Sequence, residues 1–256
     1  VLRCLQKCIN AVCFPEHRPA GDYFVTEHQF ACEIVPWKRA VLKRMFNGEI
    51  GRLYADAKNL HQESAPDYIM SDDGKKRSKI PESIQGLVAG FPCQDISKYN
   101  VHHQKAHGCV AASSRRTGSV FHGLVGCLKK SSEYQETGAF KNVKNLAEIP
   151  AGKTIHDSNL ACCLQMLTDE AQVFAVPVRV DPRCFAGPQS RDRIFMPYVS
   201  IKHMEEIGLT KRAAYDGIMT LLDRLCDHGR VLLSDLCEDE EHPIVKEKLD
   251  RLHALP

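Results

Sequence analysis

Hydrophobic residues recur along this chain in short runs that switch between strand-like and helix-like spacing. Continuous or alternating apolar runs predict strands at 30–36, 83–91, 139–146, 173–180 and 193–199, with a shorter strand or turn at 53–56. Apolar side chains at intervals of three and four residues predict helices at 1–13, 37–46, 118–129, 160–167 and 205–225. The intervening segments are polar or rich in Pro and Gly and are expected to be loops, at 14–21, 62–79, 96–116 and 181–189.

This alternation of strands and helices predicts an α/β protein with a doubly wound, mostly parallel sheet. In such sheets ligands bind outside the carboxyl ends of the strands. Polar or reactive side chains fall at the ends of four predicted strands: Glu33, Asp56, Cys93 and Asn142. We therefore expect one ligand site along this edge.

Composition narrows the class of protein only moderately. Of the 256 residues, 43% are hydrophobic, which is enough for a sizeable core and argues against disorder. The formal net charge of +2 neither requires nor excludes a polyanionic partner. No run of about 18 apolar residues occurs, so we expect no membrane partner.

Twelve cysteines are spread along the chain without a Cys-x-x-Cys pair. In a chain of this length the pattern favours reduced core thiols and an intracellular protein, nuclear if the source is a eukaryote. His102, His103, His107 and Cys109 have the side chains of a zinc site but not the usual spacing, so we expect a polar loop there and no metal.

Cys93 has two interpretations when it is taken alone. It follows the predicted strand 83–91 within Gly-Phe-Pro-Cys-Gln-Asp-Ile-Ser, and Pro92 restricts the backbone before it. A strand end followed by a helix or loop is a place where a thiol pKa can be lowered, which makes the thiolate a nucleophile. The alternative is a buried core cysteine.

The segment 90–97 resembles the nucleophile motif of cytosine carbon-5 methyltransferases, and four further segments resemble other motifs of that family in the family's order. These are the acidic strand end Glu33–Pro36, Arg-Thr-Gly-Ser-Val-Phe at 116–121, Lys-Asn-Val at 141–143 in place of Glu-Asn-Val, and the Gln-x-Arg-x-Arg segment within 185–195. The ordered set covers residues 30–196. It implies a fold of the S-adenosylmethionine-dependent methyltransferase type.

The resemblance also implies an activity, the transfer of a methyl group from S-adenosylmethionine to carbon 5 of cytosine in DNA. In the family a cysteine thiolate adds to carbon 6, which makes carbon 5 nucleophilic toward the methyl group. Loss of a proton then expels the cysteine. The target base must leave the helical stack to be reached.

Residue roles carry over position by position. Glu33 would hold the cofactor ribose and Asp56 the adenine amine, with further cofactor contacts at Ile34 and Pro92. Cys93 would be the nucleophile, supported by Asn142, while Arg191 and Arg193 steady the base and a nearby phosphate. Other substrate contacts are expected at Gln94, Ser97, Arg116 and Gln189, and the basic loop 98–116 would close over the substrate.

Lys141 is one of three departures from the family pattern. The family has a glutamate here, which accepts hydrogen bonds from the cytosine ring and helps to protonate it. A charged lysine accepts none. Because general acid–base groups are typically worth about 10²–10⁴-fold, we expect weak or no turnover.

The other two departures concern the ends of the resemblance. No Gly-rich cofactor turn precedes Glu33, and no full target-recognition region follows Phe195. We accordingly expect a catalytic core at 1–200 that lacks the first Gly-rich motif and its strand, because the chain begins just after that turn. A helical segment is expected at 201–256, in the place of a reduced target-recognition region.

Three alternatives stay open at this point. A tRNA cytosine methyltransferase would carry the same nucleophile motif, so RNA is a possible substrate in place of DNA. A catalytically inactive nucleic-acid-binding or regulatory protein would explain Lys141 and the absent Gly-rich turn. A thiol or zinc protein of another class could use the same cysteines.

Overall fold

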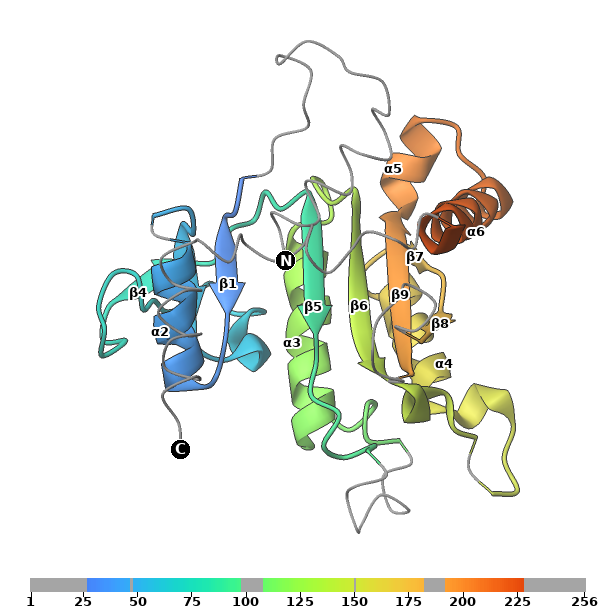
Figure 1. Ribbon diagram of the computed structural model, residues 1–256, viewed down its shortest axis with the longest axis horizontal. Coiled ribbons are helices and arrows are strands. Elements are labelled where there is room, and N and C mark those ends of the chain that lie inside the picture. Colours follow the sequence, from blue (N-terminus) through green and yellow to red (C-terminus); the bar gives the residue numbers. More distant parts are fainter. Residues whose placement is uncertain (1–26, 47, 98–107, 150, 182–191, 228–256) are drawn as a thin grey trace, which may run out of the picture. The chain divides into compact units, whose positions relative to one another are not determined.

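The computed structural model describes residues 27–46, 48–97, 108–149, 151–181 and 192–227 (Figure 1). Nearly all of them belong to one compact unit, residues 25–180 and 192–218. A second unit, residues 1–24, 181–191 and 219–256, is described only at Asp181 and 219–227. The predicted helix 1–13 and loop 14–21 lie outside the described residues. No helix in the described part of the chain is long and apolar enough to cross a membrane.

A five-stranded sheet forms the centre of the larger unit. Its strands are β5 (Gly86–Gly90), β6 (Thr137–Val143), β9 (Arg193–Ser200), β7 (Val173–Ala175) and β8 (Val178–Val180). Their order is β5-β6-β9-β7, and β8 also pairs with β9. The α/β class is confirmed. The sheet is mixed, because β5 and β6 are parallel while β9 runs antiparallel to β6, β7 and β8.

The connections explain this mixture. Strands β5 and β6 are joined through helix α3 (Arg116–Lys130), and a parallel pair needs such a crossover. The connection from β8 to β9 is the short Pro/Gly-rich segment 181–192, and those two strands are antiparallel. The segment predicted as one strand, 173–180, forms two strands, β7 and β8. The strand is interrupted at Pro177, because proline has no N–H to donate to a strand ladder.

Two smaller sheets complete the described strands. Strand β1 (Phe30–Cys32) pairs in parallel with β2 (Arg52–Tyr54) through helix α2 (Pro36–Met45), close to the predicted elements. Strands β3 (Ser64–Pro66) and β4 (Arg77–Lys79) form an antiparallel pair inside the segment predicted as a loop. That prediction was wrong because only one residue of the six, Ala65, is buried, so the pair leaves almost no hydrophobic pattern.

The remaining helices are α4 (Asn159–Asp169), α5 (Ile201–Glu206) and α6 (Lys211–Asp227), with 3-10 turns η1 (Ala57–Asn59), η3 (Lys144–Ala147) and η4 (Ile155–Asp157). The single predicted helix 205–225 is two helices. Gly208 separates them with a φ of 66°, a left-handed conformation that ends α5.

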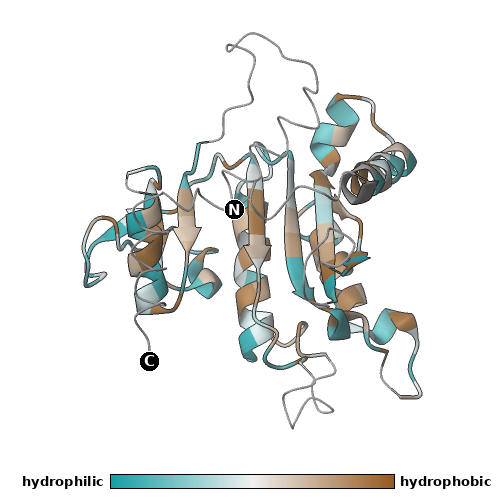
Figure 2. Cartoon of the chain, in the orientation of Figure 1, coloured by the Kyte–Doolittle hydropathy of each residue, from teal (hydrophilic) through white to brown (hydrophobic). Residues whose placement is uncertain are grey.

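Helix α3 packs on the large sheet through aromatic side chains. The ring of Phe121 is fully buried, with its centroid 4.9 Å from that of Phe91 and 5.8 Å from that of Phe140. Hydrophobic residues are concentrated along α3 and β5 (Figure 2). On α3, a Cβ at Gly123 would fall 2.3 Å from the carbonyl oxygen of Ala57, so the helix backbone lies directly on η1. One core thus joins the β2–η1 region to the large sheet.

Candidate active site at the carboxyl ends of the strands

Cys93 lies three residues beyond the carboxyl end of β5. Its side chain is half-buried and packs partly against the core. The backbone turns immediately after it, because the carbonyl oxygen of Cys93 accepts hydrogen bonds from the amides of Ile96 at 3.1 Å and Ser97 at 2.8 Å. The predicted position of Cys93 at a strand end is confirmed.

Asn142, the penultimate residue of β6, holds the chain just before Cys93. The residue is 1% exposed, and its Nδ2 donates to the carbonyl oxygen of Phe91 at 3.2 Å. Its Oδ1 accepts from the amide of Val143 at 2.7 Å. The amide group therefore bridges the ends of two neighbouring strands at the predicted site.

Asp95 holds the chain just after Cys93. Its Oδ2 accepts a hydrogen bond of 2.8 Å from the backbone amide of Thr117, in the first turn of α3. Acidic groups are favourable there because the first amides of a helix lack intrahelical acceptors. Sequence reasoning missed Asp95. The two residues are 22 positions apart, and no local capping pattern marks the contact.

Lys141 lies beside the same strand end. In the register of the parallel pair, Lys141 is opposite Gly90, and its side chain is exposed. A Cβ built on Gly90 would be 3.5 Å from the Nζ of Lys141, so the ammonium group extends over Gly90. The structure thus brings Lys141 and Asn142 to the strand end that carries Cys93. At this position a charged lysine supplies hydrogen-bond donors only.

Glu33 and Asp56 follow the carboxyl ends of the parallel strands β1 and β2. Glu33 accepts a hydrogen bond from the amide of Val35 at 2.9 Å through Oε1. Asp56 accepts from the amide of Lys58 at 3.0 Å through Oδ1, and its Oδ2 is 3.2 Å from the Nζ of Lys58. Both Asp56 oxygens therefore have partners within the chain, whereas no described residue bonds to the second oxygen of Glu33.

An ion-pair cluster lies just past the carboxyl end of β6. The Oδ2 of Asp192 accepts hydrogen bonds from Lys144, at 3.2 Å, and from Arg179. These bonds, that of Arg179 first, lower the pKa of Asp192. Arg193 follows Asp192 and is opposite Val143 in the register, and its Nη1 donates to the carbonyl oxygen of Asp192 at 2.8 Å. The sequence singled out Arg193 but not the other three.

The remaining predicted residues differ in exposure. Gln94 and Arg116 are exposed, Ile34 is 49% exposed, and Pro92 and Ser97 are half-buried. Gln189 and Arg191 lie outside the described residues, as do His102, His103 and His107 of the zinc alternative. No group of three or more His, Cys, Asp or Glu side chains that could hold a metal occurs in the described ranges.

Burial separates five other cysteines from any nucleophilic role. It raises the pKa of Cys32 and Cys127 to about 12 and that of Cys109 to about 11. Burial also raises the pKa of Cys162 and takes that of Cys163 well above its ordinary value. Since the thiolate is the reactive form, none of these five is a candidate nucleophile near neutral pH.

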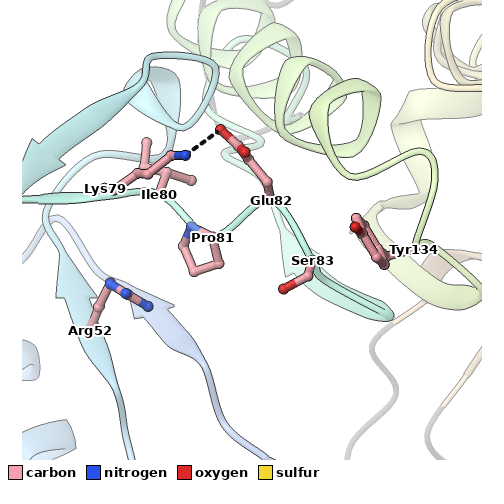
Figure 3. A pocket seen from close by; sticks show the side chains of 7 residues that line it. All are labelled: Arg52, Lys79, Ile80, Pro81, Glu82, Ser83 and Tyr134. Atoms are coloured by element: carbon pink, nitrogen blue, oxygen red, sulfur yellow. Dashed lines mark ion pairs between the residues drawn. The ribbon is translucent and has the colours of Figure 1, made fainter.

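A pocket of about 330 Å³ lies near the amino ends of β2 and β5, at the opposite ends of these strands from the candidate site (Figure 3). It is lined by Arg52, Lys79, Ile80, Pro81, Glu82, Ser83 and Tyr134. The Nζ of Lys79 is 3.1 Å from Oε1 of Glu82. None of the predicted site residues lines this pocket, so it is separate from the Cys93 site.

Comparison with protein-family models and with curated proteins gave no match. Solved structures similar to this chain include a variant of Spodoptera frugiperda DNMT2, with 17% identity and a TM-score of 0.41 over 67% of this chain. Two others are S. pombe Dnmt2 methyltransferase, over 77% of this chain, and Entamoeba histolytica methyltransferase EhMeth, over 76%, each with 13% identity and a TM-score of 0.41. The chain spans 42%, 46% and 51% of the lengths of these three, respectively.

Proposed function

We propose that this chain belongs to an S-adenosylmethionine-dependent methyltransferase that modifies carbon 5 of cytosine in nucleic acid, with Cys93 as the nucleophile and DNA as the substrate. One observation carries the proposal. Cys93 and the Lys141–Asn142 pair, far apart in the sequence, lie at the carboxyl ends of adjacent parallel strands, where α/β proteins place their ligand sites.

Asn142 and Asp95 give the nucleophile a defined position. One bonds to the backbone before Cys93 and the other anchors the backbone after it to α3. Positioning a reactive group lowers the entropic part of a reaction barrier. The Cys93 thiolate would add to carbon 6 of a base turned out of its stack, forming the C6–S bond. After carbon 5 is methylated, loss of its proton breaks that bond and releases Cys93.

S-adenosylmethionine would supply the methyl group. Its ribose would bind to Glu33, which has one carboxylate oxygen without a bond to any described residue. Asp56 fits the predicted adenine contact less directly, since both of its oxygens already bond to Lys58. An adenine amine would have to share or displace one of these bonds.

Lys141 favours a second candidate function, a nucleic-acid-binding protein without methyltransferase activity. Its ammonium group lies over Gly90, at the strand end where the family glutamate would accept hydrogen bonds from cytosine. Such a protein would retain the binding surface and lack the group that assists protonation of the ring.

Methyl transfer from radiolabelled S-adenosylmethionine to cytosine-containing duplex DNA and to tRNA distinguishes these functions. We expect slow transfer to DNA by the wild type, none by Cys93→Ser, and a rise toward about 10²–10⁴-fold in Lys141→Glu. Transfer to tRNA alone would make RNA the substrate. Nucleic-acid binding without transfer by the wild type or Lys141→Glu would establish the second function in place of the first.

A further inference from the structure

Two cations share one carboxylate next to the candidate site. Lys144 and Arg179 both bond to the same oxygen of Asp192, although they come from η3 and from strand β8. The Asp192 side chain is only 17% exposed, whereas those of Lys144 and Arg179 are 51% and 63% exposed. The carboxylate is therefore largely covered, and the two cations face solvent.

Three positive side chains lie around Asp192. Lys144 and Arg179 bond to its carboxylate, and Arg193 follows it in the chain with its Nη1 bonded to the carbonyl oxygen of Asp192. Because Asp192 already holds Lys144 and Arg179, less side-chain freedom would be lost when an anion binds to them. Groups arranged in this way suit the phosphates of a nucleic-acid backbone, which attract fixed cations without regard to base sequence.

The position of the cluster matches such a ligand. Lys144 directly follows Lys141-Asn142-Val143, and Val143 is opposite Arg193 in the antiparallel register of β6 and β9. The cluster and the nucleophile therefore lie at the same end of β6. A polynucleotide that brings one base to Cys93 has further phosphates on either side of that base, and these could reach the cluster.

We propose that Lys144 and Arg179, aligned by Asp192, bind the phosphodiester backbone of nucleic acid beside the candidate active site. The identity of this ligand rests on the proposed function. The alternative is an ion-pair network whose sole role is to connect η3 to β8 and β9. Phosphate binding and this structural role predict different effects of charge substitutions.

The experiment measures binding of a labelled DNA duplex, and of an RNA of the same sequence, at salt concentrations between about 50 and 200 mM. The variants are Lys144→Gln, Arg179→Gln and Asp192→Asn. The matched control is Lys79→Gln. Lys79 has a similar ion pair, 3.1 Å long with the lysine 61% exposed, but lies at the other edge of the sheets.

We expect Lys144→Gln and Arg179→Gln each to flatten the slope of log K against log salt by about 0.9 for duplex DNA, the value of one lost phosphate contact. Asp192→Asn removes a negative charge and should bind at least as tightly as the wild type at low salt. Lys79→Gln should match the wild type. Affinity for nucleic acid that falls in the two cation variants but does not fall in Asp192→Asn identifies phosphate binding.

Other outcomes overturn the proposal. Unchanged slopes in both cation variants, binding weakened equally by Asp192→Asn, or no binding of nucleic acid by the wild type would each leave only the structural role. The result is separable from the catalytic proposal. Reduced slopes without methyl transfer would support phosphate binding by the cluster and contradict the proposed enzyme activity. Methyl transfer with unchanged slopes would support the enzyme activity and contradict phosphate binding by the cluster.

Discussion

The side-chain amide of Asn142 donates a hydrogen bond to the carbonyl oxygen of Phe91, 3.2 Å away on the neighbouring strand end. Because Asn142 is 1% exposed, its loss would leave that carbonyl without this partner in the protein interior. We predict that Asn142→Ala lowers the free energy of unfolding by about 1–3 kcal/mol, as measured by urea denaturation. Asn145→Ala is the control, since its bond to Glu148 is exposed, and it should change stability by less than about 0.5 kcal/mol. Equal effects in both variants would contradict this.

Asp95 should matter both for stability and for the environment of Cys93. Replacement by Ala removes the acceptor of the Thr117 amide at the start of α3, which we expect to cost about 0.5–2 kcal/mol in urea denaturation. Asp95→Asn keeps an acceptor oxygen and should lose less. With the loop released, alkylation of Cys93 by iodoacetamide, followed by peptide mass spectrometry, should be faster in Asp95→Ala than in Asp95→Asn. Identical rates would show that this bond does not hold the loop.

Replacement of two glycines by alanine should change the stability of the fold in different ways. A Cβ at Gly138 would fall 2.3 Å from both the Leu87 carbonyl oxygen and the Tyr198 hydroxyl. Gly138→Ala should therefore destabilise the protein by about 1–3 kcal/mol. Gly217 lies in α6 with nothing within 4 Å of its Cβ position, so Gly217→Ala should be neutral or stabilising by up to about 1 kcal/mol. Thermal unfolding of both variants checks the pair, and a shift of the same sign would refute the packing argument.

Alkaline pH should destabilise the fold through its buried thiols. The folded-state pKa of Cys32 and of Cys127 is about 12, against an ordinary value of 9.0. A raised pKa means that the folded state keeps a proton that the unfolded state releases. The stabilisation is complete below about pH 9 and is lost as pH rises toward about 12, by about 1.4 kcal/mol per pH unit for each thiol.

Urea denaturation between pH 8 and pH 11 measures this dependence. Cys127→Val should show a shallower decline above pH 9 than the wild type, because one of these thiols is absent. Comparing the two slopes cancels the ionisation of Lys and Tyr side chains, which both proteins share. Parallel curves for the two proteins would mean that Cys127 ionises equally in the folded and unfolded states.

Much of the fold follows from local pattern. Apolar spacing predicted the ends of α3 and α4 to within two residues. It predicted the ends of β5 to within three residues and those of β9 to within one. These elements bury one face against the core, and burial of one face produces a period in the sequence. The pair β3–β4 buries almost nothing on its own, so it left no such period.

For the candidate site, the amino-acid pattern predicts which residue types stand at the strand ends, and the family resemblance implies which chemistry they suit. Three relationships come from the fold alone. Lys141 extends over Gly90, Asn142 and Asp95 anchor the backbone on either side of Cys93, and Asp192 joins Lys144 to Arg179. Periodicity reports how a segment meets the core, whereas these contacts join residues whose separation in the chain carries no local signal.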